Sequence, residues 1–178
     1  MLSLRKLPNQ RPGETVELFL RRHWIDLLKI FLLDIGLLLV PVGLYLSGIW
    51  PTGGLETLVF WQTIATLALS GYLIFILIIT MTELTDYWLD TWIVTSERII
   101  NIEQHGLFKR TVSELPLEQV QDVTSETHGF LETFLTFGDV YIQSAGEKQR
   151  FQFKNIDNQD QVKEKIVGLV QACKMRAR

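Results

Sequence analysis

The sequence predicts an α+β protein in which an N-terminal two-helix transmembrane hairpin precedes an antiparallel β-barrel or sandwich capped by a C-terminal helix. Two observations predict the hairpin: residues 57–82 carry no charged side chain, and residues 30–50 carry only Asp34. Each stretch meets the length of about 20 residues that a helix needs to cross a hydrocarbon core roughly 30 Å thick. A change of hydrophobic period from helical to alternating after residue 86 predicts the β domain.

The composition supports this division of the chain. The 178 residues are 47% hydrophobic and 21% charged, and the mean hydropathy of +0.18 is high for a soluble chain. The first apolar stretch begins only near residue 25, is longer than the 7–15 or so residues of a signal-peptide core, and has no clear cleavage site after it. It is therefore predicted to be a retained helix. The single cysteine, Cys173, cannot form an internal disulfide.

Three segments follow from these boundaries. Residues 1–29 are predicted to be a cytoplasmic N-terminal segment, residues 30–82 the transmembrane hairpin, and residues 83–178 a cytoplasmic domain. Within the first segment, the stretch GETVELFLRRHWIDLL places Val16 and Leu20 on one side of a helix, together with Trp24. This pattern predicts an amphipathic helix that lies in the membrane interface.

The distribution of basic residues predicts the orientation of the hairpin. The connection between the two apolar stretches contains no Lys or Arg, whereas several precede the first stretch: Arg5, Lys6, Arg11, Arg21, Arg22 and Lys29. By the positive-inside rule, both termini are cytoplasmic and the protein is a multi-pass protein of the plasma (inner) membrane. Trp24 and Trp88 would then anchor the inner interface, and Trp50 and Trp61 the outer one.

Asp34 is the candidate functional residue within the membrane. An ionisable side chain in a spanning helix is costly to bury and often marks a functional site. Asp34 lies only about one turn inside the first apolar stretch, however, and could reach interfacial water or the basic cluster of Arg21, Arg22 and Lys29. Both interpretations stay open from the sequence.

The cytoplasmic domain begins with predicted strands. YWLDTWIVT alternates, with Trp88, Trp92 and Val94 on one face, and IINIE follows a turn at residues 95–98. Gly106 marks a hairpin before LFKRTVSEL, and residues 117–123 are a further strand candidate.

The second half of the domain contains helical segments as well. GFLETFLTFG has apolar residues at helical spacing and predicts a short helical turn. DVYIQS and RFQFK predict a hairpin that sets Val140 and Ile142 against Phe151 and Phe153. Beyond N-cap candidates at residues 155–158, an apolar stripe running to about Cys173 predicts the helix that covers the sheets.

Four segments in this order resemble the membrane-flanked bacterial pleckstrin-homology (PH) domain proteins. They are DTWIVTSERIINIEQHGLF, ELPLEQVQDV, LTFGDVYIQSAG and FKNIDNQDQVKEKI, and PGETVELFLRRHW before the helices is also similar to the family. The resemblance runs from Pro12 to about Val170. It implies a PH-like fold of two roughly orthogonal antiparallel sheets, about seven strands in all, closed at one end by the C-terminal helix.

The basic residues of this domain give a candidate binding patch. Arg98 stands alone beside Glu97 in the turn where lipid-binding PH domains carry a basic cluster, and the remaining candidates are Lys109, Arg110, Lys148, Arg150 and Lys154. They could form a local patch or simply a solvated sheet face. From residue 83 onward, 11 basic residues face 15 acidic ones, so bulk charge gives no attraction to anionic lipid. Specific phosphoinositide binding is not predicted, and neither is a nucleic-acid partner.

The sequence also lacks the constellations that catalysis requires. His23, His105 and His128 are scattered without metal-ligand spacing, and no P-loop, GxGxxG or GxSxG motif occurs. No catalytic residue, metal site or cofactor is therefore predicted.

The function expected is a non-enzymatic, membrane-anchored interaction or scaffolding module at the inner face of the plasma membrane. Its partners would be the lipid bilayer and a membrane protein, or a second copy of the chain. The alternative is a small oligomeric transport or envelope-stress-sensing protein that acts through its two helices.

Overall fold

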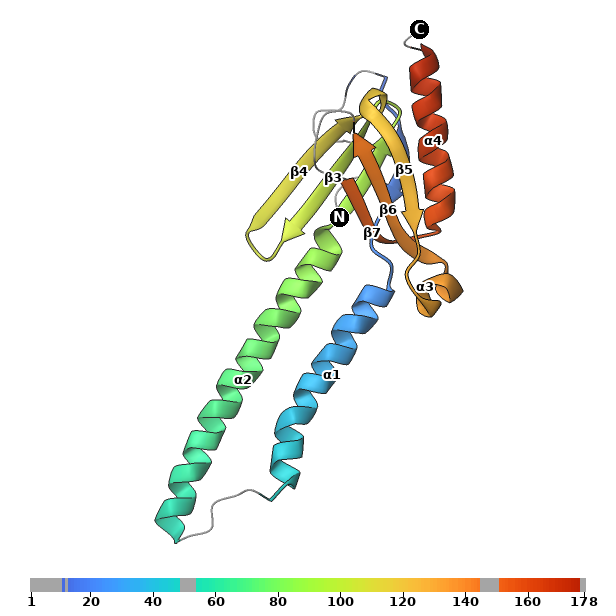
Figure 1. The fold of residues 1–178 in the computed structure, drawn as a ribbon. Coiled ribbons are helices and arrows are strands. Elements are labelled where there is room, and N and C mark those ends of the chain that lie inside the picture. Colours follow the sequence, from blue (N-terminus) through green and yellow to red (C-terminus); the bar gives the residue numbers. More distant parts are fainter. Residues whose placement is uncertain (1–10, 12, 49–53, 145–150, 177–178) are drawn as a thin grey trace. The chain divides into compact units, whose positions relative to one another are not determined.

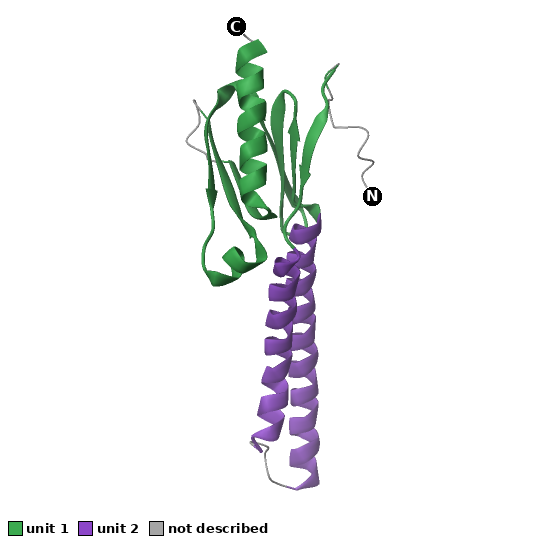
Figure 2. Cartoon of the chain, turned by 90° about the vertical axis from the view of Figure 1, so that its right-hand side faces the viewer, with its two compact units in different colours: residues 1–23, 89–178 green, residues 24–88 purple. Residues whose placement is uncertain are grey.

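The computed structural model describes residues 11, 13–48, 54–144 and 151–176. The chain forms two compact units, one comprising residues 1–23 and 89–178 and the other residues 24–88 (Figure 2). The first is called the β unit below, and the second the helical unit. The β unit is discontinuous in sequence, because the helical unit lies between its two parts.

The helical unit contains α1 (Ile25–Leu46) and α2 (Leu55–Leu89), which are joined through residues 47–54. Both predicted apolar helices are confirmed as helices, and α2 continues seven residues beyond the predicted end at residue 82. The strand predicted from residue 86 is therefore wrong in its first residues, and β2 begins at Thr91. Tyr87, Trp88 and Leu89 are compatible with either structure, and the helix ends just before Asp90.

One sheet of the β unit contains four antiparallel strands in the order β1-β2-β3-β4 (Figure 1). These are β1 (Val16–Leu20), β2 (Thr91–Thr95), β3 (Arg98–His105) and β4 (Lys109–Pro116). The predicted hairpin at Gly106 is confirmed by the pairing of His105 with Lys109.

Strand β1 corrects the prediction of an interfacial amphipathic helix in residues 13–28. The stretch VELFL pairs with β2, from Val16 opposite Thr95 to Leu20 opposite Trp92. Leu18 and Leu20 pack against the hydrophobic core of the β unit. Their spacing of two residues is the period at which side chains of a strand lie on one face. This segment forms a strand rather than a helix because pairing with β2 satisfies its backbone hydrogen bonds and buries every second side chain.

The second sheet has the order β5-β6-β7, with β5 (Val120–Glu126), β6 (Phe137–Ser144) and β7 (Phe151–Asp157). The predicted hairpin is confirmed, since Val140 pairs with Phe153 and Ile142 with Phe151. A short 3-10 helix, η1 (Leu117–Gln119), precedes β5, and α3 (Phe130–Leu135) is the predicted helical turn before β6. The C-terminal helix α4 (Gln159–Arg176) is also as predicted.

The two sheets and α4 share one hydrophobic core. Helix α4 contributes the stripe Val162, Ile166 and Val170, and the centre contains Trp92 against Phe153 with ring centroids 5.6 Å apart. A smaller cluster of Ile93, Ile100 and Ile102 is also buried and lies apart from this core. Because residues alternate across a strand, Ile93 and Ile100 project from the face of the first sheet opposite to Trp92 and Ile99.

Gly138 allows β6 to pass close to its neighbours. A Cβ atom at this position would lie 2.5 Å from the backbone oxygen of Glu126 and 3.2 Å from the side chain of Gln159. The register between β6 and β7 shifts between Gly138 and Val140. Position 138, near the start of β6, therefore has no room for a side chain, and glycine is required there.

Candidate functional site

The candidate basic patch is only partly supported by the positions of its residues. Arg98 is buried, with 4% of its side chain exposed, and is removed from any binding surface. Lys109 and Arg110 are exposed at the beginning of β4, whereas Lys154 is exposed on β7 of the other sheet. Lys148 and Arg150 lie outside the described residues. The exposed basic group that remains together is the Lys109–Arg110 pair.

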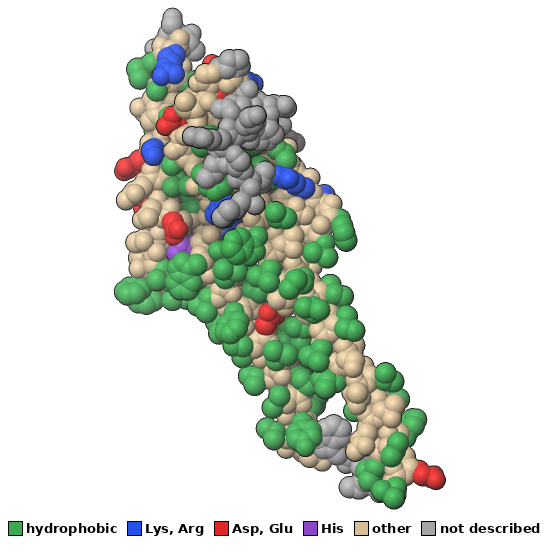
Figure 3. Space-filling model, turned by 180° about the vertical axis from the view of Figure 1, so that it is seen from behind, with side chains coloured by type: hydrophobic (Ala, Val, Ile, Leu, Met, Phe, Trp, Pro, Cys, Tyr) green, Lys and Arg blue, Asp and Glu red, His purple; other side chains and the backbone are tan. Residues whose placement is uncertain are grey.

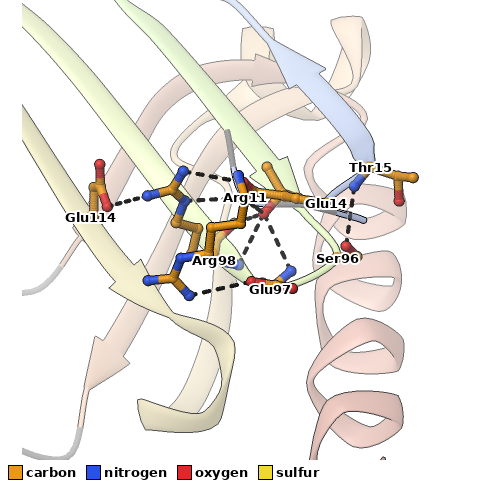
Figure 4. Close-up of polar contacts among 8 residues, drawn as sticks. Arg11, Glu14, Thr15, Ser96, Glu97, Arg98 and Glu114 are labelled. Atoms are coloured by element: carbon orange, nitrogen blue, oxygen red, sulfur yellow. Dashed lines mark hydrogen bonds and ion pairs between the residues drawn. The ribbon is translucent and has the colours of Figure 1, made fainter. Parts of the chain in front are cut away.

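Arg98 instead forms the centre of a buried ion-pair network (Figure 4). Its Nε donates to Oε1 of Glu14 at 2.9 Å, and one terminal nitrogen donates to Oε2 of Glu14 at 3.1 Å. The other terminal nitrogen donates to Glu114 at 2.6 Å. The Glu14 side chain is fully buried in this arrangement. Such two-point contact between a guanidinium and a carboxylate fixes geometry as well as charge.

Further hydrogen bonds hold Glu14 in its ionised form. The Thr95 hydroxyl donates to Glu14 at 2.8 Å, and the backbone N–H of Arg11 donates to its other oxygen at 2.9 Å. Burial is the largest single influence and acts to raise the pKa of Glu14. The hydrogen bonds from Arg98, Arg11 and Thr95, together with the positive charge of Arg98, outweigh it and hold this pKa below its ordinary value. The hydrogen bond to Glu14 is the main cause that raises the pKa of Arg98.

This network fastens the N-terminal part of the chain to the first sheet. Glu14 precedes β1, Arg98 begins β3, and Glu114 lies on β4, so three separate segments meet at one guanidinium. Glu14 and Arg98 are 84 residues apart in the sequence. Sequence reasoning missed Glu14 because no local pattern connects it to Arg98. The one available signal was the alternation of β3, which places Arg98 on the same face as the buried Ile100.

A second polar cluster lies where the chain passes between the β unit and the helical unit. Arg22 forms an ion pair with Asp90 at 2.5 Å, and the other carboxylate oxygen of Asp90 accepts the backbone N–H of Gln104 at 2.6 Å. The backbone N–H of His23 donates to the carbonyl of Asn155 at 2.6 Å. The His23 ring stacks on Phe137 with centroids 4.6 Å apart. The two crossing points of the chain are therefore tied to both sheets of the β unit.

Asp34 has a polar partner inside the helical unit. The hydroxyl of Thr80 in α2 donates to Oδ1 of Asp34 in α1 at 2.8 Å. Nearby, the Tyr72 hydroxyl donates to the backbone oxygen of Leu37 at 2.9 Å. On the same helix, Lys29 pairs with Asp26 at 3.0 Å.

The tryptophans proposed as interfacial anchors are exposed where they are described. Trp24 is 53% exposed just before α1, Trp88 is 59% exposed near the end of α2, and Trp61 is 45% exposed in the first part of α2. Trp50 lies outside the described residues. About half of each of these three side chains is therefore exposed to the surrounding medium.

The described part of the chain brings no metal-binding cluster together. Each histidine pairs with a different carboxylate, namely His23 with Asp157, His105 with Glu103 and His128 with Glu126. Across residues 11, 13–48, 54–144 and 151–176, no group of three or more His, Cys, Asp or Glu side chains could hold a metal ion.

Two antiparallel sheets closed over one core by a C-terminal helix, attached to a pair of apolar helices, define a PH-like domain joined to a helical hairpin. The family model described as "Bacterial PH domain" matches residues 31–169, and the chain belongs to this family. The match includes most of the helical unit and the β unit from β2 into α4, but not β1. The expected resemblance is thus confirmed.

Among solved structures, the chain is similar to a DUF1696 family protein with a pleckstrin-homology domain from Shewanella loihica PV-4, whose crystal structure is at 2.00 Å resolution. The sequences are 16% identical, the TM-score is 0.38, and the alignment covers 46% of this chain and 70% of the other. No curated protein matches this chain.

Proposed function

We propose that this protein is a membrane-anchored, non-enzymatic interaction module at the inner face of the plasma membrane. In this proposal α1 and α2 both span the bilayer, and the β unit lies in the cytoplasm with both chain termini. The PH-like domain binds a protein or another ligand close to the membrane. Confinement near the bilayer raises the effective concentration of the domain for membrane-bound partners without any additional contact.

The pairing of β1 with β2 carries this proposal. Strand β1 precedes both helices and β2 follows them, yet the two strands pair in antiparallel fashion from Val16 opposite Thr95 to Leu20 opposite Trp92. If the helices cross a membrane, residues 16–20 and 91–95 must therefore be on the same side, so the number of crossings is even. The surplus of Lys and Arg before α1, with none between the two apolar stretches, favours the cytoplasmic side.

The surfaces of the two helices support the spanning arrangement. Each helix contains an 18-residue stretch with a mean hydropathy of 2.3. In α1, 0% of this stretch is buried, and in α2, 6% of it is buried. Hydrophobic side chains are visible along both helices in Figure 3. At a rise of 1.5 Å per residue, α1 is about 33 Å long, close to the thickness of the hydrocarbon core. A soluble protein would not leave so many large apolar side chains in water.

Strand β4 offers the β unit an edge for a partner. It is the last strand of the four-stranded sheet, and Val112 near its centre is 49% exposed. An extended peptide could add to this edge through backbone hydrogen bonds, with its side chains resting on the sheet.

A cysteine-labelling experiment tests the topology. In a Cys173→Ala background, single cysteines replace Glu56 at the start of α2 and Met175 near the end of α4, and a membrane-impermeant maleimide is applied to intact cells or spheroplasts. The proposal expects labelling at position 56 and protection at position 175, with the reverse in inverted vesicles. Equal labelling of both positions from one side would refute a two-span hairpin.

A photo-crosslinking amino acid in place of Val112 tests the binding edge. The same photo-crosslinking amino acid in place of Glu164, an exposed residue of α4, is the matched control. A defined protein captured from position 112 and absent from position 164 is the expected result. Equal capture at both positions, or none at position 112, would contradict binding at β4.

The alternative function, an oligomeric transport or stress-sensing assembly, depends on the helices alone. The contact between Asp34 and Thr80 gives the intramembrane carboxylate a partner within its own chain, which favours a structural role for Asp34. Loss of function in Asp34→Asn with an intact β unit would favour the alternative. Retention of function after both helices are replaced by an unrelated spanning hairpin would favour the anchor.

A further inference from the structure

Two groups of apolar side chains project from the β unit into solvent. The first, called the turn tip, consists of Leu107 and Phe108 between β3 and β4, and Phe108 is 97% exposed. The second, called the α3 tip, comprises Phe130, Leu131 and Phe134, which are 82%, 63% and 75% exposed. Clusters of exposed aromatic residues of this kind on a folded domain mark an interaction site.

The turn tip lies next to the point where the chain enters the β unit from α2. Asp90 is the first residue after α2, and it accepts the backbone N–H of Gln104 at 2.6 Å. The turn at residues 106–108 begins two residues beyond Gln104, at the end of β3. The turn tip therefore belongs to the end of the first sheet at which β2 begins.

The α3 tip lies next to the other crossing point. Helix α3 leads directly into Phe137, which stacks on His23, the last residue of the β unit before α1. The Arg22–Asp90 ion pair then joins the two crossing points. Both tips consequently occupy the same end of the β unit, and the C-terminus of α4 lies at the opposite end (Figure 1). Lys174 of α4 contacts the backbone of Val120, at the far end of β5.

The charges beside the tips suit an anionic surface. Lys109 and Arg110 directly follow Phe108 and are exposed. At the α3 tip, the Glu126 carboxylate contacts the His128 ring at 3.1 Å, and Glu132 accepts the backbone N–H of His128. These two carboxylates thus have local partners, whereas the basic pair is next to an aromatic ring. Aromatic side chains flanked by Lys and Arg are typical of segments that enter the headgroup region of anionic membranes.

We propose that the turn tip and the α3 tip insert into the headgroup and upper acyl region of the bilayer that α1 and α2 span. Lys109 and Arg110 contact anionic headgroups beside the turn tip. The β unit is then held by its two covalent connections to the helices and by the two tips. The remaining edges and faces of the domain keep a constant orientation towards the cytoplasm. This inference rests on the proposed function, because it requires the helices to be in the same bilayer.

Depth-dependent fluorescence quenching of the full chain in proteoliposomes tests the proposal. In the Cys173→Ala background, single cysteines replace Phe108, Phe134, Met175 or Leu39 and carry the same environment-sensitive fluorophore. Vesicles contain phosphatidylethanolamine and phosphatidylglycerol, with a fraction of the lipid brominated along the acyl chain. Met175 is an exposed apolar residue at the opposite end of the β unit and controls for dye-driven insertion. Leu39, 60% exposed on α1, reports on the spanning helix itself.

The expected result is a blue-shifted emission and strong bromolipid quenching at positions 39, 108 and 134, with neither at position 175. Lys109→Gln combined with Arg110→Gln should reduce quenching at position 108 in anionic vesicles and leave it unchanged at position 39. Quenching at position 39 with solvent-like emission at positions 108 and 134 would overturn the inference and leave the proposed function intact. Absence of quenching at position 39 would instead overturn the spanning arrangement on which the inference depends.

The competing explanation is that the two tips bind a second copy of the chain instead of the bilayer. In that case the emission at positions 108 and 134 would shift to the blue without bromolipid quenching. The shift would also disappear when the protein is diluted in excess lipid. That combination would refute insertion into the bilayer.

Discussion

Replacing Glu14 with glutamine should strongly destabilise the β unit. The substitution preserves the shape of the side chain but removes the charge that faces the Arg98 guanidinium. Arg98 would remain buried at 4% side-chain exposure, with the Nε and one terminal nitrogen directed at a single neutral acceptor. Leaving a buried cation without its counter-ion costs more stability than removing both partners of the ion pair.

The size of the effect follows from what remains around Arg98. Removing one partner of a buried ion pair costs about 3–5 kcal/mol. Glu114 still accepts from Arg98 at 2.6 Å and compensates part of the charge, although its side chain is 41% exposed. The glutamine carbonyl also retains one hydrogen bond. The lower end, about 3 kcal/mol of unfolding free energy, is therefore expected.

The single cysteine of the chain provides a readout specific for this unit. Cys173 on α4 is partly buried against the main core, so its reaction with a thiol reagent reports unfolding of the β unit while the helices stay in detergent. Urea slopes for small domains are about 1–3 kcal/mol per molar. A loss of about 3 kcal/mol should lower the midpoint of Cys173 protection by about 1–3 M urea.

The matched control is Glu118→Gln, the same chemical change at an exposed residue of η1. It should leave the midpoint nearly unchanged, because surface substitutions usually alter stability by less than about 0.5 kcal/mol. If Glu14→Gln shifted the midpoint no more than this control, the buried pair would not hold the sheet together. Replacement of both partners by Glu14→Leu and Arg98→Met should cost less than Glu14→Gln alone.

Three further predictions concern pH, packing and the helical pair. The lowered pKa of Glu14 stabilises the fold at neutral pH, so the urea midpoint should fall as the pH drops below about 4.5 through the folded-state pKa, and Glu14→Gln should abolish that part of the dependence. Gly138→Ala should lose about 1–3 kcal/mol by overpacking in the Cys173 assay, whereas Gly168→Ala on α4, with open space around it, should gain up to about 1 kcal/mol. Thr80→Val removes the hydrogen bond to Asp34 and should lower the stability of the helical pair by about 0.6 kcal/mol, measured by titration with a denaturing detergent.

Much of this fold could be predicted because its signals are local. A charge-free run of residues predicts a long apolar helix whatever surrounds it, and the β6–β7 hairpin follows from alternation on both sides of one turn. Strand β1 could not be predicted in this way. Its five residues also fit a helical pattern, and the decision depends on β2, which begins only after both helices.

The candidate site shows the same division between local and distant information. Lys109 and Arg110 follow a turn and are exposed. Arg98 also follows a turn, but it is buried because it pairs with a carboxylate 84 residues away in the sequence. Pairing over that distance leaves no periodicity to detect, and recognition of Glu14 as its partner requires the folded sheet.

The interrupted order of the β unit has a consequence for its biogenesis. A ribosome releases β1 first, and the segment that completes its ladder is synthesised only after both apolar helices. During that interval β1 exposes an unpaired edge, which is the state in which strands are captured by other chains. If α1 and α2 span a bilayer as proposed, failure of one helix to insert would leave β1 and β2 on opposite sides of it, and Glu14 could not reach Arg98. Under the proposed topology, completion of the sheet would therefore act as a check on membrane integration, because a chain that crosses the bilayer only once cannot pair β1 with β2.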